Sequence, residues 1–284
     1  MERRFLNILF LGLLALMGLL SSCVKEADIE LPEVDSKLVL HCFITDTTDT
    51  IRARITWSKP VFSTNPLSSS YAFDNVRDLS VEISDGVVTK SLVFDAGQED
   101  YKIAASEIGL TVGTYYTLTA SHPNGQRIEA TAQIPSAPIL VTADELIAEN
   151  VVDPSGYNSA RYTFKTTLAG IDQENLRYRF VYDAIMDTIN NWGYVSRSGE
   201  GFIQSDGTSS PIYHEQQVTY YGDFGAPQAW KVYVVLGDES YYRYHKSISN
   251  SGYEGPFDEP TLVYSNVEGG LGVFGGFRQI VLDY

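Results

Sequence analysis

Residues 270–275 read Gly-Leu-Gly-Val-Phe-Gly, the G-x-G-x-x-G spacing with which a strand-to-helix turn holds a dinucleotide phosphate. That chemistry needs a helix after the third glycine and an acidic residue about 20 positions further on. Nine residues follow Gly275 in this sequence, so we expect no nucleotide site. Glycines also let two backbones approach closely, which is the role we predict for them here.

The pair His214-Glu215 begins like the zinc motif H-E-x-x-H, but the second histidine is missing. Two ligands one helical turn apart are what that motif requires. The other histidines, His41, His122 and His245, are scattered along the chain. We therefore expect no transition-metal site and no cofactor.

Acidic residues are numerous, and two kinds of chemistry could use them. Residues 95–100 include three acids that could gather around calcium, but they lack the EF-hand spacing, so a solvated turn is predicted. Glycoside cleavage needs two carboxylates that meet in the fold, and no pair stands out in the sequence. G-x-S-x-G, the signature of a nucleophile elbow, is absent. We predict that the protein is not an enzyme; a glycosidase with an unrecognised carboxylate pair is the third alternative.

Residues 1–23 carry the chemistry of a lipid anchor. Arg3 and Arg4 precede an apolar run over residues 5–20, which is short for a membrane span and typical of a signal peptide. Small residues before Cys23 resemble the lipobox of bacterial lipoproteins, in which the cysteine sulfur takes a diacylglycerol and the new amino end is acylated. We predict a signal peptide over residues 1–22 and outer-membrane lipid as a partner through acylated, palmitate-bearing Cys23, because several acyl chains hold stably.

The second cysteine, Cys42, lies in an apolar stretch and is predicted to be a core residue. Residues 23–36 form an acidic tether, and the lysine and acids after Cys23 resemble the surface-export signal of Bacteroidota lipoproteins. We expect a surface-exposed protein of the outer membrane, with the periplasmic face as the alternative. Cleavage after residue 22 changes the formal charge from −16 to −17, and without a basic stripe nucleic-acid binding is not expected.

The first part of the chain alternates short strand patterns with turns, which is typical of a small antiparallel sandwich. Asp85-Gly86 predicts a tight hairpin turn in which both residues need positive φ. We predict an immunoglobulin-like β-sandwich over residues 37–138. Its strands are expected at residues 38–44, 51–57, 81–84, 87–94, 114–120 and 127–134.

Residues 139–284 are predicted to form a second β-rich domain with one short helix. Strands are expected at residues 161–168, 176–186, 230–237 and 278–282, and residues 190–211 are interpreted as a loop. Asp238 can cap a helix over residues 239–249, in which Tyr241, Tyr244, His245 and Ile248 form one stripe. We interpret this stripe as a packing face.

Fifteen of the 19 tyrosines lie after residue 138. Tyrosine suits both strands and recognition surfaces, since it offers a flat apolar ring with a polar tip. We take Trp192, Tyr194, Tyr220 and Tyr221, in loop-like surroundings, as candidate binding residues for a glycan or a protein.

A polar turn leads into the glycine run, and we predict that Asn266 and Glu268 hydrogen-bond the backbone there. The candidate structural motif consists of Tyr264, Ser265, Asn266, Glu268, Gly269 and Gly270. The chain resembles the Bacteroidota outer-membrane lipoproteins of the domain-of-unknown-function family 4249. The resemblance lies in the anchor, the Lys-Leu-Val at 37–39, and residues 113–118, 241–244, 256–260 and 263–277. Genes of that family are often found beside TonB-dependent receptors, so the resemblance implies such a receptor as partner and supplies no catalytic residues.

Taken together, these features predict a non-enzymatic, lipid-anchored accessory or binding lipoprotein that acts with a TonB-dependent transporter. The alternative is a surface adhesin that binds a glycan or a protein through the tyrosine-rich segments.

Overall fold

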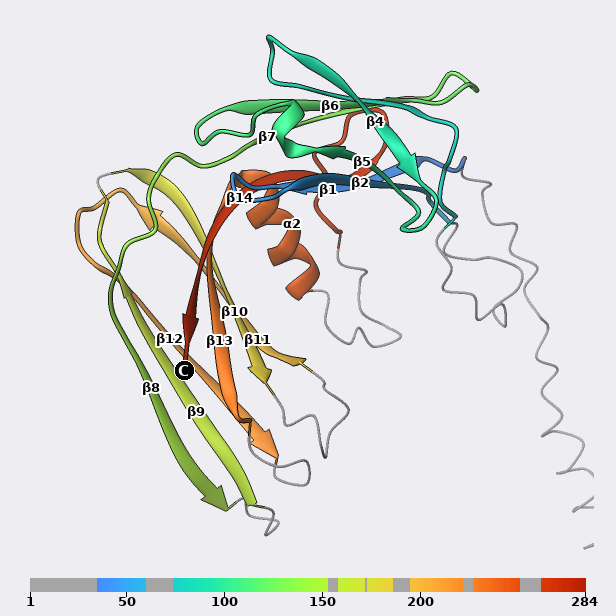
Figure 1. The fold of residues 1–284 in the computed structure, drawn as a ribbon. Helices are drawn as coiled ribbons and strands as arrows, with labels where there is room; N and C mark the ends of the chain where they lie inside the picture. Colours follow the sequence, from blue (N-terminus) through green and yellow to red (C-terminus); the bar gives the residue numbers. More distant parts are fainter. Residues whose placement is uncertain are drawn as a thin grey trace, which may run out of the picture.

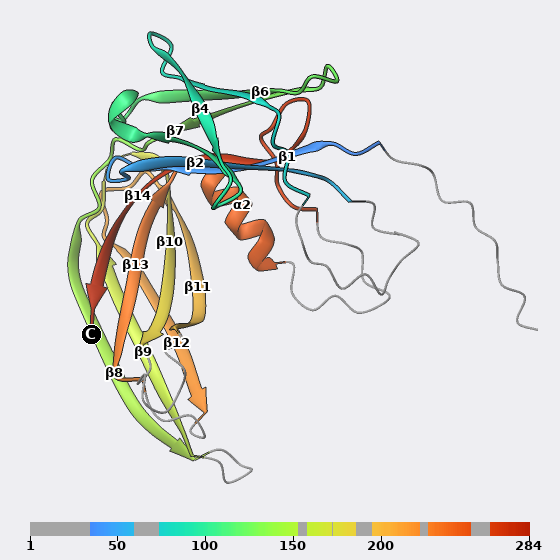
Figure 2. The same ribbon diagram turned by 45° about the vertical axis from the view of Figure 1, so that its right-hand side comes forward.

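The computed structural model describes residues 35–59, 74–152, 158–171, 173–185, 195–221, 227–250 and 262–284. Strands make up 60% and helices 7% of it, so the predicted mainly β, sandwich-like class is confirmed. The strands divide into two lobes, and those of the first lobe lie across one end of the second (Figures 1 and 2).

The first lobe is built from short strands whose buried and exposed residues alternate, the pattern of sheets that face a core on one side. Its strands are β1 (Leu38–Ile44), β2 (Thr50–Trp57), β3 (Ser80–Ser84), β4 (Thr89–Asp95), β5 (Asp100–Ala104), β6 (Tyr115–Ser121) and β7 (Arg127–Gln133), with a 3₁₀ turn η1 (Ala105–Glu107). The predicted strands are therefore present, within a few residues at their ends.

Longer strands form the second lobe. They are β8 (Val141–Val152), β9 (Asn158–Leu168), β10 (Glu174–Ile185), β11 (Val195–Asp206), β12 (Ile212–Tyr221) and β13 (Ala229–Gly237). Helix α2 (Glu239–Asn250) follows β13, and strand β14 (Leu271–Asp283) comes last. The helix predicted from its cap and stripe is thus confirmed.

Strand β14 belongs to both lobes. Over residues 271–276 it runs parallel to β1, and from Phe277 onward it runs antiparallel to β13. Among the described residues, this dual pairing links eleven strands into one sheet, in the order β11-β10-β13-β14-β1-β2-β5-β4-β3-β6-β7, while β12-β9-β8 form a separate sheet. The antiparallel pattern expected for the first lobe is therefore broken at one pair, because the partner of β1 comes from the far end of the sequence.

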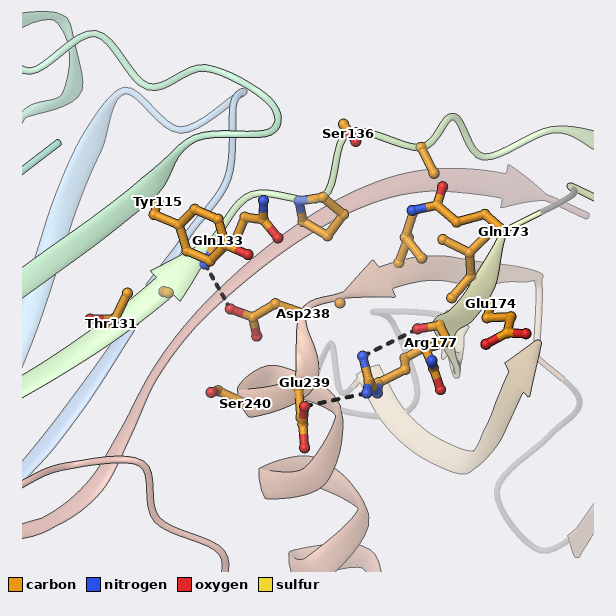
Figure 3. Close-up of a pocket in the computed structure, with 17 residues that line it drawn as sticks. Tyr115, Thr131, Gln133, Ser136, Gln173, Glu174, Arg177, Asp238, Glu239 and Ser240 are labelled. Carbon is orange, nitrogen blue, oxygen red and sulfur yellow. Dashed lines mark hydrogen bonds and ion pairs between the residues drawn. The ribbon is translucent and has the colours of Figure 1, made fainter. Parts of the chain in front are cut away.

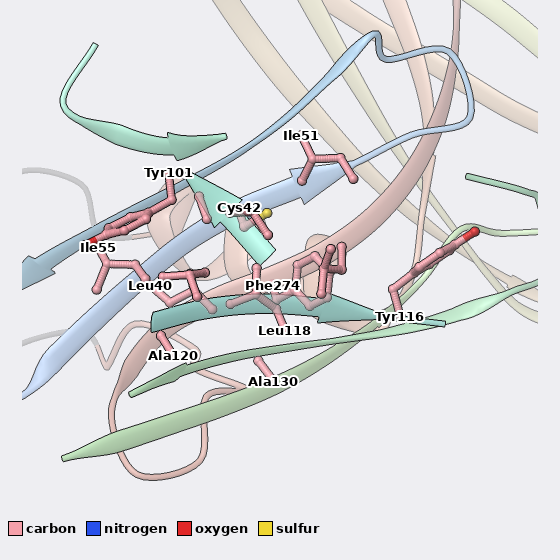
Figure 4. Close-up of a cluster of buried hydrophobic side chains, with 14 of the residues drawn as sticks. Leu40, Cys42, Ile51, Ile55, Tyr101, Tyr116, Leu118, Ala120, Ala130 and Phe274 are labelled. Carbon is pink, nitrogen blue, oxygen red and sulfur yellow. The ribbon is translucent and has the colours of Figure 1, made fainter. Parts of the chain in front are cut away.

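The buried side chains form two clusters, and the chain passes from the first to the second between Ile134 and Ala137. The first contains Leu40, Leu118 and, from β14, Phe274 (Figure 4). The second extends from Ala137 to Leu236 and lies between β10, β13 and the β12-β9-β8 sheet. A division into domains at residue 138 stays a prediction, since β14 contributes to both lobes.

Residues 195–206, interpreted as loop, are a strand, and this prediction was wrong. Strand β11 pairs antiparallel with β10 from Glu174 to Ile185. Its sequence is rich in glycine and serine, which weakens the periodic signal, but tertiary pairing with a buried neighbour overrides weak intrinsic preference.

The Asp85-Gly86 hairpin forms, but its turn differs from the one expected. Gly86 has φ of +90°, whereas Asp85 is not among the residues with positive φ. Its carboxylate Oδ1 instead accepts hydrogen bonds from the backbone N–H groups of Val87 and Val88, at 2.8 and 2.7 Å. Asp85 therefore stabilises a longer turn through its side chain.

Candidate functional site

A pocket of about 400 Å³ lies where the two lobes meet (Figure 3). Three segments far apart in sequence line most of it: residues 131–137, 173–177 and 236–240. Tyr115, the first residue of β6, completes the wall. Small-molecule sites often occupy such junctions and have this order of volume, so this pocket is the candidate site.

Asp238 connects three elements near the pocket, helix α2 and strands β7 and β14. Its Oδ1 accepts a hydrogen bond from the N–H of Tyr241 at 2.7 Å, which caps α2 as predicted. Its Oδ2 accepts from the N–H of Gln133 on β7 at 2.9 Å and from that of Gly276 on β14 at 3.0 Å. Burial raises the pKa of Asp238 above its usual value. Both carboxylate oxygens are thus engaged in structural bonds.

Arg177 and Glu239 face each other at one side of the pocket (Figure 3). Arg177 Nη2 lies 3.4 Å from Glu239 Oε2, and Arg177 Nη1 donates to the carbonyl of Asn175 at 3.2 Å. The other oxygen of Glu239 accepts from Arg243 Nη1 at 3.2 Å, one helical turn further along α2. Glu239 is therefore shared by two guanidinium groups, while Arg177, with five N–H donors, retains spare donors.

A bulge in β10 brings Glu174 and Arg177 to the same pocket. The register with β11 shifts between these two residues, and Asn175 between them has φ of +64°. Bulges redirect side chains in this way and are common beside functional sites. Gln204 Nε2 donates to Asn175 Oδ1 at 2.7 Å and holds the bulge in place.

Gly207 leaves the space that Glu174 occupies. Gly207 has φ of +81°, and a Cβ there would come within 2.5 Å of Glu174 Cγ. A glycine is required on both counts, since L side chains rarely adopt this φ.

The turn predicted at residues 264–270 contacts the pocket wall, because Asn266 bonds to Thr131 and Ser240, which line the pocket. Asn266 Oδ1 accepts from the N–H of Phe274 at 3.0 Å, and its Nδ2 lies 2.8 Å from the Phe274 carbonyl, 3.0 Å from that of Thr131 and 2.9 Å from Ser240 Oγ. The prediction that Asn266 pins the backbone is confirmed. Glu268 acts differently: its backbone N–H and carbonyl pair with those of Glu129, at 2.8 and 3.1 Å, and its side chain is exposed.

The remaining residues of this motif also make local contacts. Ser265 Oγ accepts from the N–H of Val267 at 3.3 Å, and the ring of Tyr264 lies 4.3 Å below the guanidinium of Arg243. Gly269 has φ of +75°, and a Cβ there would collide with the carbonyl of Arg127; a Cβ on Gly270 would come within 2.5 Å of the carbonyl of Leu38.

The glycine run therefore packs backbone against backbone, as predicted. Gly272 has φ of +104° and lies against the Leu40 carbonyl too closely for a side chain. The segment forms a strand instead of the strand-to-helix turn that a phosphate site needs.

The other motifs with chemical potential have structural surroundings. His214 lies on strand β12, stacked on Phe180 with ring centroids 4.1 Å apart, and burial lowers its pKa to about 4. Cys42 is buried in the first cluster, as predicted, and burial raises the pKa of its thiol. In the turn at residues 95–100, Asp95 is bound by Lys102 at 2.6 Å and Asp100 by Arg52 at 2.8 Å.

No three metal-binding side chains gather anywhere in the described residues. Within the same ranges, no helix has both the length and the apolar character needed to cross a bilayer.

Several sequence-predicted site residues stay predictions. Cys23, Trp192 and Tyr194 lie outside the described residues. Tyr220 and Tyr221 end β12, and their side chains lie outside the description too. The pocket residues Tyr115, Glu174 and Arg177 were not singled out from the sequence; Asp238, found as a helix cap, was the one signal leading there.

The geometry defines a mainly β, two-lobed protein with a polar pocket at the junction of its lobes. The sequence model of the family described as a domain of unknown function (DUF4249) matches residues 24–280, so the chain belongs to this family. A search of curated proteins found no match.

Proposed function

We propose that this chain is a lipid-anchored, non-catalytic binding protein of the outer membrane that acts as an accessory to a TonB-dependent transporter. The observation that carries the proposal is the pocket between the lobes, which is lined mainly by polar side chains, with a few apolar ones and one exposed aromatic ring. Such a pocket provides recognition of a small polar ligand.

The bonding of the pocket acids supports binding over catalysis. Both oxygens of Asp238 accept backbone hydrogen bonds, and Glu239 is shared between Arg177 and Arg243. A general acid for glycoside cleavage needs a raised pKa and freedom to give up its proton. Asp238 has the raised pKa, but it is engaged in holding α2, β7 and β14 together.

The placement in the cell envelope is supported by the sequence. The basic start, the short apolar run and the small residues before Cys23 fit a lipoprotein signal. A charge of −17 after cleavage keeps the remaining chain away from anionic lipid headgroups, so acyl chains on Cys23 would be its means of attachment. The transporter partnership is supported only by the resemblance to lipoproteins encoded beside such receptors.

Metabolic labelling with an alkyne-bearing palmitate tests the anchor. The wild-type protein is expected to take the label and to fractionate with the outer membrane, and Cys23→Ser to lose both properties. Cys42→Ala is the matched control and should keep the label, because Cys42 is a core residue. Label retained on Cys23→Ser, or residues 1–22 still attached to the mature protein, would contradict the proposal.

Affinity purification from native outer membranes tests the partner. The lipidated protein is expected to retain a TonB-dependent receptor after extraction in each of several mild detergents. A protein that is recovered alone in all of them would count against the accessory role.

A further inference from the structure

The pocket between the lobes has a charge balance that points to the chemistry of its ligand. Three carboxylates line it, on Glu174, Asp238 and Glu239, together with the guanidinium of Arg177. Asp238 and Glu239 already have partners, as described above. A strongly anionic ligand would be repelled by these carboxylates. Because Asp238 and Glu239 are engaged within the protein, Glu174 and Arg177 are the charged groups left to face a ligand, and their opposite charges favour a polar ligand without net charge.

The pocket retains both hydrogen-bond donors, on Arg177, and acceptors, on Glu174, for a ligand. Arg177 uses two of its donors, at 3.2 and 3.4 Å, which leaves N–H groups for a ligand. The side chain of Glu174 has neither a hydrogen bond nor an ion pair to any described residue, and an ionised carboxylate can accept up to about four bonds. A ligand that both donates and accepts many hydrogen bonds, as a polyol does, would match this set.

Tyr115 adds an apolar surface to the polar wall. Its side chain is 61% exposed, and Figure 3 shows its ring on the side of the pocket away from Glu174. The face of an aromatic ring carries negative potential and attracts weakly positive C–H groups. A pyranose ring presents such C–H groups on one face and hydroxyls around its edge.

We propose that the pocket between the lobes binds a short neutral saccharide. One sugar ring stacks on Tyr115, and hydroxyls at the other end of the saccharide bond to Glu174 and Arg177. This inference rests on the proposed function and names the ligand class of that site. The volume of about 400 Å³ accommodates a small ligand, and the β10 bulge at Asn175 directs Glu174 and Arg177 toward it.

A glycan array followed by titration calorimetry tests the proposal on the full-length lipidated protein. The protein is kept in lauryldimethylamine oxide, because a maltoside detergent would itself carry a sugar headgroup. The array contains neutral and charged oligosaccharides, and a lysine-containing tripeptide is titrated in parallel. We expect a neutral oligosaccharide to bind.

Three variants separate this site from other surfaces. Tyr115→Ala should weaken binding of that oligosaccharide about tenfold, whereas Tyr115→Phe should change it less than about threefold, because the ring face is kept. Glu174→Gln should also weaken it, since one charge-assisted set of acceptors is lost. Tyr213→Ala is the matched control, because Tyr213 is an exposed tyrosine on β12, 55% accessible, that does not line the pocket.

The proposal would be overturned if no neutral glycan bound, or if the tripeptide or a charged glycan bound more tightly than any neutral glycan. Equal losses of affinity in Tyr115→Ala and Tyr213→Ala would overturn it too. These outcomes leave the anchor and the transporter partnership untouched, because palmitate labelling and co-purification measure those separately.

Discussion

The two lobes build their buried cores from different kinds of side chain. Among the described residues, three of the 25 members of the first cluster are aromatic, against six of the 14 in the second. The first core is built mainly from aliphatic side chains on short strands. The second packs Phe164, Tyr182 and Trp230 between two layers of long strands, with ring centroids 4.8 Å apart for Phe164 and Tyr182 and 5.1 Å for Phe164 and Trp230.

Polar atoms inside the two cores also differ. In the first lobe, Tyr101 Oη donates to the carbonyl of Val76 at 3.0 Å and accepts from the N–H of Leu79 at 2.9 Å. In the second, Tyr182 Oη and Trp230 Nε1 have no hydrogen-bond partner among the described residues. In the first lobe, Tyr101 therefore contributes both apolar volume and, through its hydroxyl, hydrogen bonds to the backbone. In the second lobe, Tyr182 and Trp230 contribute chiefly apolar volume.

The largest expected contrast concerns the buried ion pairs. Arg179 on β10 bonds to Glu200 on β11 at 2.6 and 3.2 Å and to Tyr241 Oη on α2 at 2.8 Å, and its side chain is only 6% exposed. Glu200→Ala should lower the free energy of unfolding by about 3 kcal/mol, because a buried guanidinium is left without its counter-ion. Urea denaturation followed by circular dichroism measures the change.

The matched variant in the first lobe is Asp100→Ala. Its partner Arg52 is 43% exposed and can be hydrated when the carboxylate is removed, so a loss of about 1 kcal/mol is expected. Equal losses in the two variants would show that burial of the arginine does not distinguish the lobes.

A smaller contrast should appear when the pH is lowered. The folded-state pKa of His214, lowered by burial to about 4, lies below the ordinary value of 6.5. Between these values the unfolded chain binds a proton that the folded chain does not, so stability falls as the pH drops from about 6.5 to 4, by about 2 kcal/mol. Hydrogen exchange with mass spectrometry should show this loss in the second lobe.

His214→Gln removes the proton-binding group and should flatten this part of the pH profile. The control is His122→Gln in the first lobe, where His122 Nε2 lies 3.2 Å from Oδ1 of the exposed Asp78. An unchanged pH slope in His214→Gln would assign the acid sensitivity to other groups.

The smallest contrast is between two hydroxyl groups. Tyr101→Phe removes two hydrogen bonds to the backbone and should cost about 1 kcal/mol, since buried partners are left unsatisfied. Tyr182→Phe removes a hydroxyl without a described partner and should be neutral or slightly stabilising. Thermal unfolding of the two variants beside the wild type measures the difference, and a larger loss in Tyr182→Phe would reverse our view of the second core.

Much of the fold could be predicted because its signals are local. Period-two alternation identified β2, and Asp238 with the stripe of Tyr241 and Tyr244 identified α2. Strand β11 was missed because its glycines and serines carry no periodic signal; pairing with β10 defines it. Local pattern cannot reveal a strand whose stability comes from its neighbour.

The pocket could not be predicted for a related reason. Tyr115 lies on β6, whereas Glu174 and Arg177 lie on β10, and no spacing in the sequence connects the first with the other two. Glu174 and Arg177 share a face only because of the bulge at Asn175. The role of Asp238 could be predicted only in part. Its helix cap is a local feature, but its bonds to Gln133 and Gly276 span 105 and 38 positions of sequence.

The dual pairing of β14 has a consequence for the order of events during biosynthesis. Strand β1 is made early, yet the strand beside it, residues 271–276, is made more than two hundred residues later. The pairing of β14 with β1 is a contact of high sequence separation, and such contacts form slowly. The sheet that joins the two lobes is therefore complete only after β14 has paired with both β1 and β13.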